Sequence, residues 1–118
     1  IEHVKKALVE IEEGRVFQAI ASLPLHQKIV LKAAVSTALK KGYATTGEVY
    51  QVYVEEAKKK GLEPLTMRRV SDILLQLDMM GLLIAETVSR GRYGVTKLIR
   101  VKREVAAVAE KALKDLEA

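Results

Sequence analysis

The chain has 118 residues, 49% of them hydrophobic and 30% charged, with a formal net charge of +5. These proportions fit one globular domain with one modest core and exclude a disordered polypeptide. The absence of cysteine excludes disulfides and thiolate metal sites. It also fits a reducing cytosol, so we expect a cytoplasmic protein. No apolar run approaches the roughly 20 residues that span a bilayer, so no membrane partner is expected. The lack of both asparagine and cysteine, which are chemically labile when hot, favours a thermophilic source.

The positive charge is concentrated in one segment of the chain. Residues 66–103 contain eight basic and three acidic residues, whereas the remaining residues contain twelve of each. A local excess of this size predicts a polyanionic partner. It further predicts that the bases of this segment are gathered on one side of the molecule.

Residues 2–23 predict a first helical region, weakened at Gly14 by about 1 kcal/mol relative to alanine. The chain begins with Ile1 rather than methionine, so we expect a piece of a larger protein. Residues 1–23 would then form a connecting helix from a preceding domain, and residues 24–118 would form the functional domain. Ser22 is placed to cap the next helix, whose first turn tolerates Pro24.

Two further helices follow. Residues 25–40 are apolar on nearly every side, which is typical of a central core helix. Residues 43–45 form a short connection that allows one β-bridge. Thr45 and Glu48 then have the spacing of a capping box, which predicts a helix from there to the lysines before Gly61.

The segment from Thr66 organises the rest of the fold. Thr66 caps a helix that ends near Met80 and has a buried arc (Val70, Ile73, Leu74, Leu77, Met80) and an outer arc (Arg68, Arg69, Asp72, Leu75, Gln76, Met79). Residues 83–88 and 95–101 predict a hairpin, and residues 104–116 predict a last helix. This order predicts a mainly α (α+β) winged helix-turn-helix, with a three-helix core, a β-hairpin wing and extra N- and C-terminal helices.

The N-terminal half of this helix carries the first candidate site. The second helix of a helix-turn-helix enters the DNA major groove with its N-terminal residues toward the bases, which arginine and glutamine can read. The alternative without a binding role is that the two arginines simply lie on a solvated helix face. The candidate residues are Thr66, Arg68, Arg69, Asp72 and Gln76.

The tip of the hairpin carries the second candidate site. Ordinary turns use aspartate, asparagine or serine, whereas this turn has paired arginines between glycines that allow close backbone approach. Arginine is favoured in a narrow minor groove by its negative potential. The candidate wing residues are Arg90, Gly91, Arg92, Tyr93, Gly94 and Lys97.

Other chemistry-bearing residues have structural interpretations. His3 and His26 have no helix-spaced histidine partner, so no metal site is expected. Tyr50 and Tyr53 are interpreted as core or rim aromatics. The sequence lacks a P-loop and a nucleophile elbow, so no catalytic residue and no enzymatic activity is expected in this chain.

Five motifs together resemble one known family. They are Leu23–Lys28, Thr46–Tyr50, Pro64–Asp72, Leu77–Leu82 and Gly91–Gly94, and the resemblance covers nearly all of residues 15–101. On these motifs the chain is similar to the C-terminal winged-helix domain of archaeal replication initiators, AAA+ proteins related to origin recognition complex subunit one and cell division control protein six.

The resemblance implies binding to double-stranded DNA at the repeats of replication origins. The helix from Thr66 would enter the major groove, and the Gly91–Gly94 turn would lie against the backbone or minor groove. Residues 1–23 would follow a missing AAA+ ATPase domain, which would hold ATP or ADP and Mg²⁺ and help load the replicative helicase; this chain itself would hold no cofactor. The isolated domain is expected to be a monomer on nucleoid DNA.

Two alternatives remain open at this point. The first is a protein-interaction module that contacts the replicative helicase, favoured by the apolar Leu75 and Met79 on the outer arc. The second is a dimeric winged-helix transcription regulator whose terminal helices pair two chains.

Overall fold

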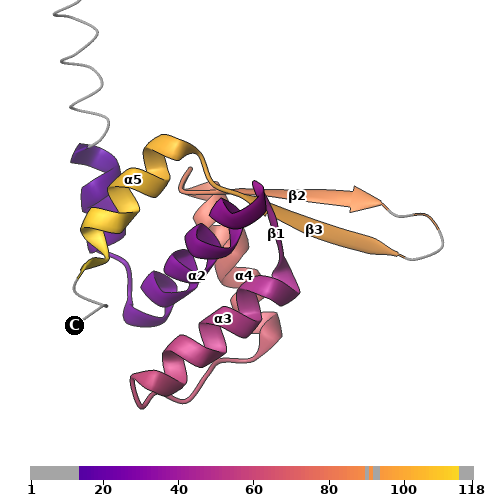
Figure 1. Cartoon of the computed structure of the whole chain (residues 1–118), viewed down its shortest axis with the longest axis horizontal. Coiled ribbons are helices and arrows are strands. Elements are labelled where there is room, and N and C mark those ends of the chain that lie inside the picture. The colour runs from indigo at the N-terminus through magenta and orange to yellow at the C-terminus, as the bar shows by residue number, and fades with distance from the viewer. Residues whose placement is uncertain (1–13, 90, 92–93, 115–118) are drawn as a thin grey trace, which may run out of the picture.

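The computed structural model describes residues 14–89, 91 and 94–114. Residues 14–21 are helical. They are followed by α2 (Leu25–Lys41), β1 (Ala44–Thr45), α3 (Thr46–Lys59), α4 (Met67–Met79), β2 (Ile84–Ser89), β3 (Val95–Arg100) and α5 (Arg103–Ala112). The predicted winged helix-turn-helix is therefore confirmed: three helices form the body, and a hairpin projects from it (Figure 1).

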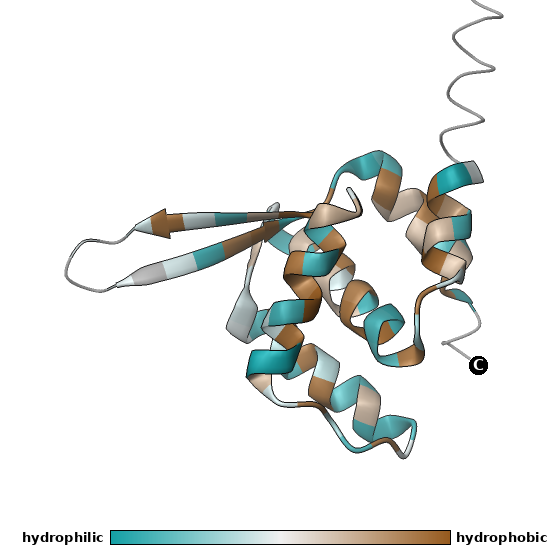
Figure 2. Cartoon of the chain, turned by 180° about the vertical axis from the view of Figure 1, so that it is seen from behind, coloured by the Kyte–Doolittle hydropathy of each residue, from teal (hydrophilic) through white to brown (hydrophobic). Residues whose placement is uncertain are grey.

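Helix α2 runs through the centre of the helical body. Ile29, Val30 and Leu31 are fully buried although they point in three directions around the helix, which confirms the predicted core helix. Figure 2 shows hydrophobic residues concentrated where the helices face one another. Gly42 ends α2 with φ 87°, a left-handed conformation that glycine adopts without steric cost.

Helix α3 begins with the predicted capping box. The Thr45 hydroxyl accepts a hydrogen bond from the Glu48 amide at 3.2 Å, and the Glu48 carboxylate accepts one from the Thr45 amide at 3.1 Å. These two bonds satisfy backbone donors that the first helical turn leaves unpaired.

The sheet has three antiparallel strands in the order β1-β3-β2. The predicted hairpin pairs Ile84 with Arg100 at its base and Ser89 with Val95 toward its tip. The short strand β1 pairs Ala44 with Ile99 and Thr45 with Leu98. This pairing fixes the start of α3 beside the inner strand of the wing.

Two local predictions are wrong. Ser22 does not cap α2, because its hydroxyl donates to the Gln18 carbonyl at 2.8 Å and the N-cap position is occupied by Pro24. Met80 does not belong to the buried arc of α4, because it is the C-cap residue and 48% of its surface is exposed. Leu82 and Leu83, which follow the turn at Gly81, enter the core in its place.

The described residues cover the two predicted terminal helices only in part. Helix α5 ends at Ala112, before the predicted limit at Leu116, and residues 115–118 lie outside the described residues. Most of the predicted first helical region, residues 1–13, also lies outside them.

Candidate nucleic-acid interface

Helix α4 presents a polar face to solvent. Its buried side chains Val70, Ile73, Leu74 and Leu77 fix the helix to the core. All five candidate residues of this helix are exposed, as predicted: Thr66, Arg68, Arg69, Asp72 and Gln76. Thr66 caps the helix, since its hydroxyl accepts a hydrogen bond from the Arg69 amide at 3.3 Å.

A hollow of about 520 Å³ separates α4 from the wing. Arg68 lines it from α4 and Lys97 lines it from β3, so two bases distant in sequence face the same space. The N-terminal residues of α3 close the hollow, because β1 pairs with β3 and brings Thr46 and Gly47 to this point. The hollow thus combines two cations and the carboxylate of Asp72 with the start of a helix, where partial positive charge favours anions.

A second hollow, of about 510 Å³, lies on the other side of α4. Arg69, Asp72 and Gln76 line it from α4, and residues 24–27 at the start of α2 line it from the opposite side. The Gln27 amide donates to the Gln76 side-chain oxygen at 3.4 Å and connects the two walls. Helix α4 therefore projects as a ridge between two depressions.

The bases of residues 66–103 do not all belong to this face. Side chains alternate along a strand, so Lys97 shares its face with the buried Ile99, whereas Arg100 points away from the core. The Arg100 guanidinium instead lies 3.6 Å from the carboxylate of Glu86 on the outer face of the hairpin. The prediction that the segment gathers its bases on one side is wrong for Arg100.

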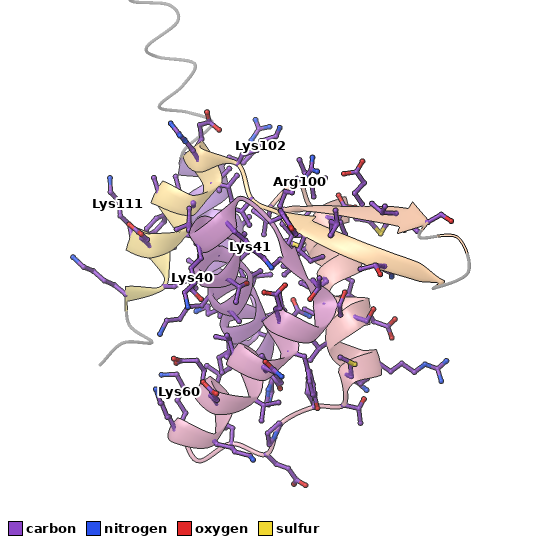
Figure 3. All side chains as sticks on the ribbon, turned by 45° about the vertical axis from the view of Figure 1, so that its right-hand side comes forward. Lys40, Lys41, Lys60, Arg100, Lys102 and Lys111 are labelled. Atoms are coloured by element: carbon purple, nitrogen blue, oxygen red, sulfur yellow. The ribbon has the colours of Figure 1, made fainter. Side chains whose placement is uncertain are left out.

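A separate group of bases is visible in Figure 3. It is spread over the left and centre of the view, whereas α4 lies on the right. Its residues come from the ends of α2, α3 and β3, from the residue that precedes α5 and from α5 itself: Lys40, Lys41, Lys60, Arg100, Lys102 and Lys111. Basic side chains are therefore not confined to α4 and the wing.

The wing tip is described at its two glycines. Gly91 and Gly94 have φ values of 63° and 88°, and the Gly94 amide donates to the Gly91 carbonyl at 3.2 Å. A side chain would be strained at either position, so these glycines make the tight turn possible. Arg90, Arg92 and Tyr93 lie outside the described residues, and their assignment to the wing stays a prediction.

Two tyrosines fix the segment that leads into α4. The fully buried Tyr53 accepts a hydrogen bond from the Leu65 amide at 2.9 Å, and the half-buried Tyr50 donates to the Leu65 carbonyl at 3.0 Å. Both polar groups of Leu65, the residue directly before the cap Thr66, are thereby held by α3. The interpretation of these tyrosines as core and rim residues is confirmed.

Electrostatics also stabilises the start of α3. The ammonium group of Lys41 lies 3.0 Å from the Glu48 carboxylate, and together with the Thr45 amide it lowers the pKa of that carboxyl group. Because Thr45 and Thr46 line the hollow shared with the wing, this ion pair fixes one wall of the candidate interface.

Several lining residues were not identified from the sequence: Thr46, Gly47, Thr96, His26 and Gln27. Their proximity to α4 depends on the pairing of β1 with β3 and on the packing of α2, neither of which leaves a local pattern. Within the part of the chain that the structure describes, no three metal-ligating side chains come together. No described helix combines the length and apolarity needed to cross a membrane.

Comparison with known proteins gives consistent matches. A family model described as the CDC6 C-terminal winged-helix domain matches residues 18–111. An ORC1-type DNA replication protein of Desulfurococcus amylolyticus is 52% identical over all 118 residues, and the chain covers 30% of that protein. The chain spans less than a third of the length of such relatives.

Two solved structures agree with this match. The structure of the Aeropyrum pernix ORC1 protein in complex with DNA has a TM-score of 0.84 and 40% identity, with coverage of 94% of this chain and 30% of that one. The structure of Drosophila ORC bound to DNA has a TM-score of 0.68 and 26% identity, with coverage of 95% and 28%.

Proposed function

Because the chain belongs to the family of Cdc6 C-terminal winged-helix domains, we propose that it binds double-stranded DNA at replication origins as the C-terminal module of an archaeal initiator. The observation that carries this proposal is the ridge of α4, which projects between two hollows and has Arg68 and Arg69 at its N-terminal end. The DNA-bound relative from Aeropyrum pernix supports the same partner.

The dimensions of duplex DNA suit this ridge. The major groove is about 12 Å wide, which admits one α-helix. With α4 in the groove, the two phosphate backbones that border the groove would occupy the two hollows. Lys97 and the start of α3 would meet one backbone, and the first turn of α2 would meet the other. Arg68, Arg69, Asp72 and Gln76, which α4 carries between the two hollows, would face base edges.

The wing adds a second contact in this proposal. Its strands extend away from the helical body (Figure 1), and the Gly91–Gly94 turn would bring Arg90 and Arg92 against the backbone or the adjacent minor groove. Arginine binds a narrow minor groove through its enhanced negative potential. The wing contacts would strengthen binding with less dependence on sequence than the contacts of α4.

The remainder of the protein supplies the other activities in this proposal. We assign ATP or ADP and Mg²⁺ to an AAA+ domain outside this chain, with residues 1–23 as the connection to it. Contact with the replicative helicase would belong to the whole initiator, which would act on nucleoid DNA in the cytoplasm. The isolated chain should sediment as a monomer, and a dimer would favour the transcription-regulator alternative.

Footprinting of the 118-residue chain on an origin duplex and on a random duplex of equal length tests the proposal. We expect protection of discrete repeats on the origin duplex and weak, uniform protection on the random one. The variant Arg68→Ala should lose the discrete protection, whereas Lys111→Ala, on α5, should keep it. Failure to protect any duplex would contradict the proposed function.

A further inference from the structure

The outward ridge of α4 changes from charged to apolar side chains along its length. At about 100° per residue, Arg68, Asp72, Leu75 and Met79 fall within an arc of about 60° on the side opposite the core. The first two are charged and the last two are apolar. Leu75 is 40% exposed and Met79 is 87% exposed, so the C-terminal half of the ridge offers two apolar side chains to solvent.

These two side chains have neighbours that indicate their partner. They continue the line of Arg68 and lie on the same helix face as the hollows that hold Arg69 and Lys97. Both hollows flank the N-terminal part of the ridge, where Asp72 lines each of them beside the bases, and neither is lined by Leu75 or Met79. A ligand that covers the whole ridge must therefore place anionic groups beside its N-terminal part and apolar groups in front of Leu75 and Met79. The major groove of a duplex meets both requirements, because phosphates border it and the 5-methyl group of thymine projects into it.

We propose that Leu75 and Met79 contact thymine 5-methyl groups, so that the preferred duplex carries thymines at fixed distances from the base pair that Arg68 reads. The inference rests on the proposed function and names a feature of the site that the chain recognises. A rise of about 1.5 Å per residue puts Leu75 about 10 Å and Met79 about 16 Å beyond Arg68 along the helix. Base pairs are about 3.4 Å apart along the duplex axis, and the major groove is inclined to that axis, so the thymines lie within about three to five pairs of the Arg68 contact.

The flexible thioether of Met79 suits this role. An unbranched side chain adapts to a methyl group whose position shifts with local groove width, whereas a polar side chain would require one fixed acceptor or donor. Met80, the next residue, provides a contrast within the chain. It is 48% exposed, but it lies about 100° around the helix from Met79 and off the ridge.

The test uses a duplex that the wild-type chain selects from a random pool and a second duplex with every thymine replaced by deoxyuridine. Deoxyuridine lacks the 5-methyl group and keeps every hydrogen-bonding group of the base edge. Wild-type protein should bind the uracil duplex about fourfold more weakly for each methyl group it contacts. The variants Leu75→Ala and Met79→Ala should each bind the thymine duplex more weakly and lose part of this discrimination, and the double variant should bind both duplexes equally.

Two matched variants serve as controls. Met80→Ala removes a neighbouring methionine off the ridge, and Leu39→Ala removes a 54% exposed leucine from α2. For both variants, the ratio of the affinities for the thymine and uracil duplexes should equal the wild-type ratio. This comparison also corrects for any effect of uracil on DNA shape. Because all four side chains are solvent-exposed, none of the replacements should prevent folding.

The outcomes separate this inference from the proposed function. If wild-type protein binds the thymine and uracil duplexes equally well, the inference is overturned while duplex binding stands. Unchanged discrimination between the two duplexes in the Leu75 and Met79 variants would also overturn it, because the methyl groups would then be contacted by other side chains. If no duplex is selected at all, both proposals fail.

Discussion

Nδ1 of His26 lies 2.8 Å from the hydroxyl oxygen of Tyr53. The same hydroxyl accepts a hydrogen bond from the Leu65 amide at 2.9 Å, so the Tyr53 hydroxyl takes part in two hydrogen bonds. One phenol group thereby joins the first turn of α2, the buried face of α3 and the residue before the cap of α4. The three helices of the body meet at this point, at the end of α4 that carries the arginines.

Tyr53→Phe should destabilise the fold by about 1–3 kcal/mol, because it leaves the Leu65 amide and the His26 nitrogen without their partner in a partly buried place. Urea unfolding followed by circular dichroism measures the change. Tyr43→Phe is the matched control: its ring is half exposed, and its hydroxyl makes no hydrogen bond among the described residues. Equal effects of the two replacements would contradict the role given to the Tyr53 hydroxyl.

The ion pair at the start of α3 predicts a pH dependence of stability. The Glu48 carboxyl has a pKa below its ordinary value near 4.5, chiefly because of Lys41 and then because of the Thr45 amide. A carboxyl whose pKa is lower in the folded than in the unfolded state stabilises the fold above the ordinary value, and this stabilisation is lost as pH falls through the folded value.

Glu48→Gln should therefore lower stability at neutral pH and flatten the decline of stability on the acid side. Urea midpoints measured from neutral to acidic pH would show this. Glu55→Gln removes another carboxylate of α3, one without an ion pair among the described residues, and should leave the slope of the wild-type profile unchanged. A Glu48 variant with the wild-type acid-side slope would be evidence against this account.

Two bases of β3 form a matched pair for testing which face meets DNA. Lys97 lines the hollow beside α4, whereas Arg100 lies on the opposite face of the strand, next to Glu86. Lys97→Ala should weaken binding to all duplexes and reduce the dependence of log K on log salt by about one unit, as expected for one lost phosphate contact. Arg100→Ala should change neither. If Arg100→Ala weakened duplex binding more than Lys97→Ala, the interface would lie on the face of the wing opposite to the one proposed.

Replacing an arginine of α4 should change sequence preference, whereas replacing an arginine of the wing should change overall affinity. Arg68→Ala or Arg69→Ala should cost about 1–3 kcal/mol on the preferred duplex and relax sequence preference, because these residues are placed to read bases. Arg92→Ala should weaken all sequences more evenly. Competition binding with specific and random duplexes measures both effects, and an Arg92 variant that binds every duplex like wild type would show that the wing is wrongly assigned.

Local patterns in the sequence were sufficient to predict most of the elements. The capping box at Thr45 and Glu48, the cap at Thr66 and the buried arc of α4 each depend on residues within a few positions of one another. Met80 was misplaced because the helical wheel does not show where a helix ends, and the left-handed turn at Gly81 (φ 79°) sends the chain away from the arc.

The site was less predictable than the fold. The outer arc of α4 follows from periodicity, but the hollow shared by Arg68 and Lys97 requires the register that pairs Thr45 with Leu98. That register depends on a two-residue strand, too short to leave a pattern of its own. Summing charge over residues 66–103 likewise could not show that strand alternation puts Lys97 and Arg100 on different faces.

The most direct test of the account is the salt dependence of duplex binding by the 118-residue chain. The five candidate bases are Arg68, Arg69, Arg90, Arg92 and Lys97. If each brings one positive charge to the duplex and releases about one condensed counterion, log K should fall against log salt with a slope of about −4 to −5. A slope near zero, with duplex binding that does not respond to salt, would contradict the claim that α4 and the wing bind the phosphate backbones of DNA.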